Sequence, residues 1–200
     1  MIGILSYGCG NLASLINMIK KINGSAFLCE KPSDIRKADK LILPGVGAFD
    51  YAMKSLKQGG WVEHLDHAIY EDKKKILGIC LGMQLLCKNS EEGILDGLGY
   101  IDAEVKRFDL ATGLKVPHMG WNIVYPKADN RLIDCEKEQR FYFVHSYYVD
   151  CRNEQDVLAK TQYGISFTSA VNSQNVYGVQ FHPEKSHKFG MTLLNNFVKL

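Results

Sequence analysis

Residues 76–86 read Ile-Leu-Gly-Ile-Cys-Leu-Gly-Met-Gln-Leu-Leu, and they place Cys80 between an apolar run and a helix-like stretch. Gly78 and Gly82 permit a tight, strained turn that lifts the cysteine side chain above the end of a sheet. The N-terminal N–H groups of the following helix would lie beside the sulfur and favour its thiolate form. The stretch therefore predicts a strand, a sharp turn and a helix, with Cys80 as a candidate nucleophile at the turn. The simpler alternative is a small buried cysteine between two glycines at a strand end.

A candidate base for this cysteine lies near the C-terminus. Residues 176–181 read as a buried strand that runs directly into His182-Pro183-Glu184. Because proline disfavours the helical region for the residue before it, we expect the segment to stay extended, with His182 and Glu184 on one side. A carboxylate beside an imidazole can hold the tautomer that the base of a cysteine requires. The tripeptide alone is compatible with a solvated turn, but together with Cys80 it predicts a Cys-His-Glu triad.

The hydrophobic pattern alternates between strand-like and helix-like segments up to Gly99 and is strand-rich afterwards. The expected strands cover 2–6, 26–29, 41–43, the segment from Ile76 to the turn, 100–108, 121–125, 141–149, 157–161, 166–171 and 176–181. The expected helices cover 11–22, 48–56, 62–71, the segment after Cys80 and 188–198, and 108–113 is the expected loop. This pattern predicts an α/β protein with a mostly parallel central sheet, helices on both faces and antiparallel additions.

Composition bounds the classes of function. Two hundred residues with 46% apolar content suffice for one compact domain over 1–200, and a second domain is not indicated. The net charge is +2 with acidic and basic residues interspersed, so the sequence does not predict nucleic-acid binding. No apolar stretch is long enough to predict a membrane span. Six cysteines without a C-x-x-C pair, and without a secretory leader, are typical of reduced thiols in a cytoplasmic protein.

Several motifs together resemble a known family. The run Gly78–Gln84, followed by Phe181–Glu184, resembles the catalytic motifs of the class I glutamine amidotransferases. The segments 43–49, 117–122, 143–148 and 182–186 narrow this resemblance, which spans the whole chain, to the glutaminase subunits of imidazole glycerol phosphate synthases in the histidine pathway. The resemblance implies a flavodoxin-like fold and the hydrolysis of L-glutamine to glutamate and ammonia by Cys80, His182 and Glu184.

The chemistry of these residue types fits that reaction. The Cys80 thiolate would attack the side-chain amide of glutamine, while His182 carries the proton and Glu184 orients His182, and water would release glutamate from the thioester. The backbone N–H of Leu81 is the expected first oxyanion donor, and the resemblance places the second at Gly45-Val46. The resemblance also assigns the α-amino and α-carboxylate groups of glutamine to four residues: Gln84, Glu92, Ser146 and Tyr147.

A partner is also implied by the resemblance. It is a (β/α)8-barrel cyclase subunit that receives the ammonia in a heterodimer and makes imidazole glycerol phosphate and aminoimidazole carboxamide ribotide. A sheltered route makes chemical sense, because ammonia released into water is protonated and loses its nucleophilicity. The candidate interface residues are Lys185, His118, Trp121 and Asn122. His118 and His145 lack the spacing of metal ligands and are interpreted as structural or interface histidines, so neither a metal nor a cofactor is expected.

Four other hypotheses remain open. Residues 8–13 match G-x-G-x-x-A with Glu30 downstream, which alone would indicate a dinucleotide-binding oxidoreductase, although it leaves Cys80 and His182 unexplained. A paralogous amidotransferase subunit could supply ammonia to an amidino- or amino-sugar enzyme, and Ala13 stands where arginine is often expected for the histidine-pathway family. The glutaminase subunit of pyridoxal phosphate synthase has a similar triad but is not expected to share the 117–122 and 145–148 motifs. A non-catalytic binding module on the same fold is the fourth.

Overall fold

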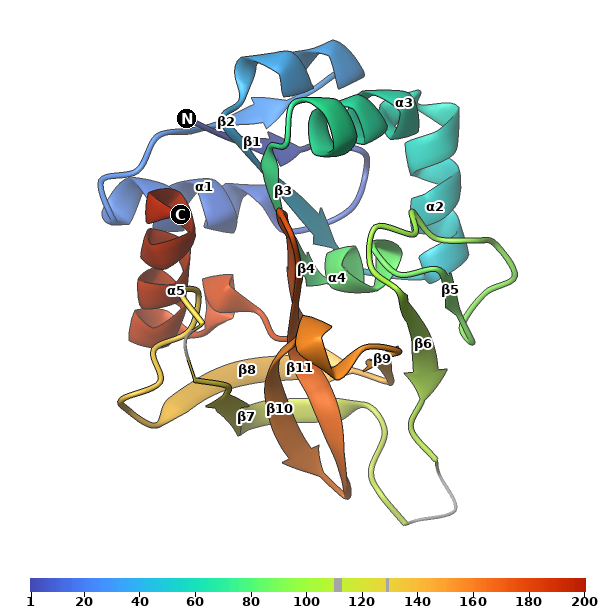
Figure 1. Ribbon diagram of the computed structural model, residues 1–200, viewed down its shortest axis with the longest axis vertical. Coiled ribbons are helices and arrows are strands. Elements are labelled where there is room, and N and C mark those ends of the chain that lie inside the picture. Colours follow the sequence, from blue (N-terminus) through green and yellow to red (C-terminus); the bar gives the residue numbers. More distant parts are fainter. Residues whose placement is uncertain (110–112, 129) are drawn as a thin grey trace.

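The computed structural model describes residues 1–109, 113–128 and 130–200, and Figure 1 shows its elements. The strands are β1 (Ile2–Leu5), β2 (Ala26–Cys29), β3 (Lys40–Gly45), β4 (Lys75–Cys80), β5 (Asn89–Ser90), β6 (Ala103–Arg107), β7 (His118–Pro126), β8 (Gln139–His145), β9 (Tyr147–Cys151), β10 (Val157–Tyr163), β11 (Ile165–Ser173) and β12 (Val176–Val179). The helices are α1 (Leu12–Lys21), α2 (Phe49–Gln58), α3 (Trp61–Asp66), α4 (Leu81–Leu85) and α5 (His187–Lys199). Short helical turns lie at η1 (Pro32–Lys37), η2 (His67–Glu71), η4 (Glu154–Asp156) and η5 (Pro183–Lys185).

The sheet has a parallel part and an antiparallel part. Its path runs β2-β1-β3-β4-β12-β11-β10-β7-β8, and the first five of these strands pair in parallel. From β12 onward the neighbours on this path are antiparallel, and β9 and β6 extend the sheet from β11. The order of the parallel strands is that of flavodoxin-like folds, which bind ligands at the carboxyl ends of the strands. The predicted α/β class, with a mostly parallel central sheet and antiparallel additions, is confirmed.

Helices cover both faces of the parallel strands. Figure 1 shows α1 and α5 on one side of β1–β4, and α2 and α3 on the other. Alternate strand residues supply the two cores: Ile42 belongs to the cluster that contains Leu15 and Leu194, while its neighbour Leu41 belongs to the cluster that contains Phe49. This alternation follows from the two-residue period of a strand and explains why these strands read as continuous apolar runs.

The parallel strands bring two site segments together. β4 ends at Cys80 beside β3, with Gly45 in register with Cys80, and β12 flanks β4 on its other side. The chain leaves β12 toward His182, so the cysteine and the histidine come from the carboxyl ends of adjacent parallel strands. The fold thus collects residues about 100 positions apart at one edge of the sheet.

Three sequence-based strand boundaries were wrong, and one of them is the strand predicted over 100–108, which in fact covers Ala103–Arg107. The sequence predicts one strand over 141–149, whereas β8 ends at His145 and β9 begins at Tyr147. The break occurs because β8 pairs with β7 while β9 pairs with β6 and β11, so the chain changes neighbours at Ser146. The strand predicted over 121–125 in fact begins at His118. Of the loop predicted over 108–113, residues 110–112 lie outside the described residues.

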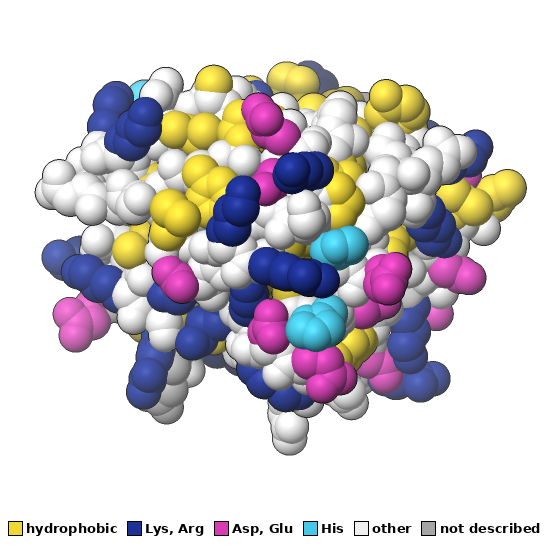
Figure 2. Space-filling view, turned by 90° about the horizontal axis from the view of Figure 1, so that it is seen from above, with side chains coloured by type: hydrophobic (Ala, Val, Ile, Leu, Met, Phe, Trp, Pro, Cys, Tyr) yellow, Lys and Arg dark blue, Asp and Glu magenta, His cyan; other side chains and the backbone are white. Residues whose placement is uncertain are grey.

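Charges of both signs are interspersed over the face in Figure 2, which looks down on the molecule from above the view of Figure 1. Exposed ion pairs also link opposite charges elsewhere, such as Lys106 with Asp150 and Lys88 with Asp102. Among the helices of the described residues, none has the length and apolar content needed to cross a membrane.

Candidate active site

Cys80 occupies a strained turn between β4 and α4. Its backbone has φ 55° and ψ −113°, a region that non-glycine residues avoid at a cost of about 1–3 kcal/mol, and its side chain is 7% exposed. Gly78 and Gly82 serve a different purpose from the one expected, because neither of them has a positive φ. A Cβ on Gly82 would lie 1.9 Å from the Leu43 carbonyl oxygen, and one on Gly78 would lie 2.7 Å from the Gly82 oxygen. The glycines therefore permit close packing of α4 on β3 and β4, while the strain falls on the cysteine.

His182 and Glu184 form a buried pair. Nδ1 of His182 lies 2.8 Å from Oε1 of Glu184, and the two side chains are 2% and 4% exposed. The extended conformation predicted for this segment was wrong beyond His182, because Pro183 starts the helical turn η5. Proline fixes its own φ at a helical value, so it starts the turn that brings Glu184 back to the ring.

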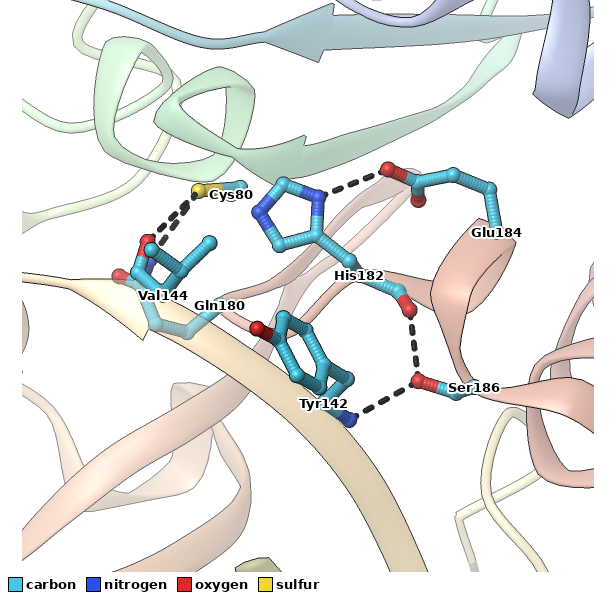
Figure 3. Close-up of polar contacts among 7 residues, drawn as sticks. All are labelled: Cys80, Tyr142, Val144, Gln180, His182, Glu184 and Ser186. Carbon is cyan, nitrogen blue, oxygen red and sulfur yellow. Dashed lines mark hydrogen bonds and ion pairs between the residues drawn. The ribbon is translucent and has the colours of Figure 1, made fainter. Parts of the chain in front are cut away.

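Hydrogen bonds fix this turn against β8 (Figure 3). Ser186 Oγ donates to the His182 carbonyl at 2.6 Å and accepts from the Tyr142 N–H at 3.0 Å. The His182 N–H donates to the Tyr142 carbonyl at 2.9 Å. The main chain on either side of the imidazole is therefore held, and the ring has a defined direction.

The second ring nitrogen of His182, Nε2, faces Cys80 in Figure 3. Nε2 is buried and has no hydrogen-bond partner in the described part of the chain. Burial lowers the pKa of His182, but the interactions with Cys80 and Glu184 outweigh it and raise the pKa to about 9. These two neighbours therefore favour the imidazolium form of His182, which carries a proton at the nitrogen that faces the sulfur.

The candidate oxyanion residues surround this cysteine. Leu81 is the first residue of α4, where backbone N–H groups have no partner within the helix. Gly45 ends β3, and a Cβ there would lie 2.7 Å from the Gly82 nitrogen, so glycine is required. Val46 is 47% exposed and Gly47 has φ +100°, and both line a cavity next to Cys80.

That cavity has a volume of about 360 Å³, which suits a small amino acid. All four residues assigned to glutamine line it together with the cysteine and the histidine: Gln84, Glu92, Ser146 and Tyr147. Glu92 accepts a hydrogen bond from the Phe49 N–H at 3.1 Å, and burial raises the pKa of its carboxyl group. Gln84 is buried and donates from Nε2 to the carbonyl of Tyr147 at 3.3 Å.

The candidate interface residues divide into two groups. Lys185 lines the cavity, with its ammonium 5.7 Å from the ring centroid of Tyr142, and Trp121 is 41% exposed and stacks on His187. His118 is 3% exposed, so its side chain does not present a surface to a partner. Asn122 is half-buried and donates from Nδ2 to His118 Nε2 and to the Gln162 carbonyl.

Sequence reasoning missed the polar network behind the cavity. His118 Nδ1 lies 2.9 Å from His145 Nε2, and Gln180 lies within 3.8 Å of the cysteine sulfur. Gln180 precedes His182 by two residues, so strand alternation could have indicated that it shares the histidine's side. The pairing of His118 with His145 across β7 and β8 depends on register, which the sequence does not state.

The glycine-rich turn at residues 8–10 packs against Pro44, next to the candidate oxyanion residue Gly45. A Cβ on Gly10 would lie 2.7 Å from Pro44, and Tyr7 donates its hydroxyl to the Pro44 carbonyl at 2.6 Å. Close packing against the segment before Gly45 therefore accounts for Gly10 without a nucleotide. Among the residues that the structure describes, no group of three or more His, Cys, Asp or Glu could hold a metal ion.

Comparison with known proteins gives a family for this chain. The sequence profile of the family described as "Glutamine amidotransferase class-I" matches residues 13–200. The chain is 52% identical over 200 residues to "Imidazole glycerol phosphate synthase subunit HisH 2" of Methanococcus maripaludis, covering 100% of this chain and 99% of that protein. It is 49% identical over 201 residues to the protein of the same name from Pseudomonas aeruginosa, covering 100% of both.

Solved structures share the fold. One titled "Crystal structure of glutamine amidotransferase" has a TM-score of 0.76 at 20% identity and covers 98% of this chain and 97% of its own. A glutamine amidotransferase from Thermotoga maritima has a TM-score of 0.64 at 17% identity, with 99% of this chain and 80% of its own covered. At these identities the likeness concerns the fold alone.

Proposed function

This chain belongs to the class-I glutamine amidotransferase family and, within it, to the HisH subunits of imidazole glycerol phosphate synthase, and from that premise we propose its reaction. It is a glutamine amidotransferase subunit that serves histidine biosynthesis, hydrolysing L-glutamine to glutamate and ammonia. One observation carries the proposed mechanism: the strained Cys80 and the buried His182–Glu184 pair meet beside a cavity of about 360 Å³.

In the first half-reaction, the Cys80 thiolate attacks the amide carbon of glutamine. The carbonyl oxygen gains the negative charge, which the Leu81 N–H and a donor at Gly45-Val46 would stabilise. His182 then donates its Nε2 proton to the amide nitrogen, so the carbon–nitrogen bond breaks, ammonia leaves and a glutamyl thioester remains. A pKa of about 9 suits His182 to this role, because the ring holds the proton at neutral pH until the leaving group takes it.

In the second half-reaction, neutral His182 takes a proton from water, which attacks the thioester carbon. Collapse of this intermediate breaks the carbon–sulfur bond, releases glutamate and restores the thiolate and the imidazolium. Glu184 keeps Nδ1 of the ring occupied at 2.8 Å, so the exchange takes place at the nitrogen that faces the sulfur.

Substrate binding follows from the cavity wall. Glu92 offers a carboxylate to the α-ammonium group of glutamine, and Ser146, Tyr147 and their backbone amides offer donors to the α-carboxylate. Gln84, which is buried, lines the same cavity.

The ammonia is delivered to a second protein chain. As a subunit of imidazole glycerol phosphate synthase, the chain works with a cyclase, and we propose that this partner is a (β/α)8 barrel docked over the cavity. Exposed Trp121 and cavity-lining Lys185 support a docking site on this side. We further propose that residues 1–200 act as one glutamine amidotransferase domain in the cytoplasm, which the continuous sheet and the unpaired cysteines support.

A second candidate function is a paralogous subunit that supplies ammonia to an amidino- or amino-sugar enzyme. Ala13, an exposed residue in the first turn of α1, favours it because arginine is often expected there. The triad chemistry is the same in both candidates, and they differ in the acceptor of the ammonia.

Glutamate release from L-glutamine tests the proposal and separates the candidates. It is measured with and without the cyclase subunit of the same organism and its nucleotide ligand, with Cys80→Ala as the control. Strong stimulation by the cyclase that disappears in Cys80→Ala is the expected result. Activity that does not respond to the cyclase would favour the second candidate, and no activity in any combination would refute the glutaminase.

A further inference from the structure

Gln180 brings an amide group to the sulfur of Cys80, and no step above uses it. Its Nε2 lies 3.8 Å from Cys80 Sγ, and its side chain is 0% exposed. Gln180 directly follows β12, the strand that pairs in parallel with β4, so the two residues leave neighbouring strand ends. Figure 3 shows the contact between the Gln180 amide and the Cys80 sulfur. A buried amide at this position must have hydrogen-bond partners for both its oxygen and its nitrogen.

The contacts of Gln84 decide which end of the Gln180 amide faces the sulfur. Gln84 Nε2 lies 3.3 Å from the carbonyl oxygen of Tyr147, which can only accept a hydrogen bond. The same Nε2 lies 3.0 Å from the Gln180 side chain, so the atom facing it must be the oxygen, Oε1. The nitrogen of Gln180 is therefore left to face Cys80.

The carbonyl of Tyr147 is itself held from behind the cavity. It accepts a second hydrogen bond, at 2.7 Å, from Nδ1 of His145. The other nitrogen of His145 accepts from His118 Nδ1, and His118 Nε2 accepts from Asn122 Nδ2. Every bond in this chain runs in one direction, because each neutral imidazole has one donor and one acceptor.

We propose that Gln180 is a further residue of the glutaminase site, whose Nε2–H donates to the thiolate of Cys80, and that Gln84 is the positioning residue that holds this amide in the donor orientation. The proposal rests on the role of Cys80 as nucleophile. The sulfur lies 4.0 Å from the Val144 carbonyl oxygen, which repels a thiolate, so a donor on the Gln180 side favours the reactive state. Hydrogen bonds to charged acceptors are the stronger ones, and both partners of this bond are buried.

Alkylation of the cysteine by iodoacetamide tests the proposal without requiring glutamine. Trypsin releases residues 76–88 as one peptide, and fragmentation separates Cys80 from the fully buried Cys87. Gln180→Met keeps the length of the side chain without a donor and should slow alkylation of Cys80 at pH 7 about ten-fold. Gln180→Glu keeps an acceptor for Gln84 but turns a negative oxygen toward the sulfur, so it should be slower still.

Matched measurements separate this effect from a loss of packing. Gln139→Met removes another buried glutamine of the sheet, whose amide donates to the Lys137 carbonyl, and it should alkylate at the wild-type rate. In both Gln180 variants kcat for glutamine should fall with little change in KM, because Gln180 does not line the described cavity. A structural role alone would lower the melting temperature and leave the alkylation rate unchanged.

The outcomes are distinct. Wild-type alkylation rates in folded Gln180→Met and Gln180→Glu would overturn the proposal while the glutaminase assignment stands. If neither variant folds, Gln84→Met decides, because it frees the Gln180 amide to turn: slower alkylation supports the proposal and the wild-type rate overturns it. Failure of the proposed function is separate and shows in the wild type, which would then release no glutamate and alkylate Cys80 no faster than exposed Cys135.

Discussion

Acid should destabilise this protein through two buried histidines that the fold keeps neutral. Burial lowers the pKa of His118 to about 4. Burial, with smaller contributions from the charges of His118 and His182, lowers the pKa of His145 to about 3. Nε2 of His145 accepts a hydrogen bond from His118, and Nε2 of His118 accepts one from Asn122. Protonation of either Nε2 would turn this acceptor into a donor and break the hydrogen bond. The perturbation is therefore a change of pH from 7 to 5.

The magnitude follows from linkage. In the unfolded chain each histidine takes up a proton near pH 6.5, whereas in the folded chain each stays neutral down to its lowered pKa. Stability from these groups is present above pH 6.5 and is lost as the pH falls, by about 2 kcal/mol per histidine at pH 5. His182 acts in the opposite direction, because its pKa is raised in the folded chain. The stability that it contributes is complete only below pH 6.5, so it increases by about 1 kcal/mol as the pH falls from 7 to 5. The expected net loss is about 3 kcal/mol.

Urea unfolding at pH 7, 6 and 5 measures this loss. With a slope of about 2 kcal/mol per molar urea, the midpoint should fall by about 1.5 M between pH 7 and pH 5. The double variant His118→Gln/His145→Gln should lose most of this pH dependence, whatever its stability at pH 7. His67→Gln is the control, because that side chain is 65% exposed and should keep the wild-type dependence. The reasoning is refuted if the double variant loses as much stability as the wild type between pH 7 and pH 5.

Three further predictions concern the site and its support. Gly82→Ala should destabilise the protein by about 3 kcal/mol or more in urea unfolding, because the new Cβ would lie 1.9 Å from a β3 carbonyl oxygen; a loss below about 1 kcal/mol would contradict this packing. Glu184→Gln removes an interaction that raises the pKa of His182. The stability that this raised pKa contributes is fully present below pH 6.5 and is lost as the pH rises through about 9. The variant should therefore lose less stability than the wild type between pH 7 and pH 10. Asp50→Ala should raise KM for glutamine several-fold with little change in kcat. The reason is that the Asp50 carboxylate accepts hydrogen bonds from the N–H groups of residues 94 and 95 and so holds the loop that carries Glu92. Steady-state kinetics in which kcat alone falls would contradict this prediction.

The sequence predicted the local part of the site well because local rules determine it. The apolar run, the turn and the helix around Cys80 lie within eleven residues, and strand–turn–helix rules apply directly. The contact between His182 and Glu184 was predicted as well, although it forms through a helical turn and not through an extended chain. The prediction of an extended chain rested on the effect of Pro183 on the residue before it, whereas the fixed φ of Pro183 itself starts the turn.

What the sequence did not predict depends on register and on distant contacts. Gln84 reaches Gln180 across 96 positions, and His118 reaches His145 because β7 and β8 pair in a particular register. A shift of one residue would turn either histidine to the other face of the sheet, and the sequence pattern alone does not exclude it. The same register buries His118, which the sequence assigned to an interface.

The two histidines that line the cavity show how partners decide which of two buried histidines favours its charged form. His145 and His182 are both buried and both line the cavity, yet the pKa of His145 is lowered to about 3 and that of His182 is raised to about 9. His182 has a carboxylate and a sulfur as neighbours, whereas His145 has a carbonyl and a neutral imidazole. If His145 were also charged, it would repel the imidazolium of His182 and compete with it for the thiolate. The uncharged chain behind the cavity therefore does more than hold the carbonyl of Tyr147, because it leaves His182, the proposed proton carrier, as the histidine of the cavity whose charged form is favoured.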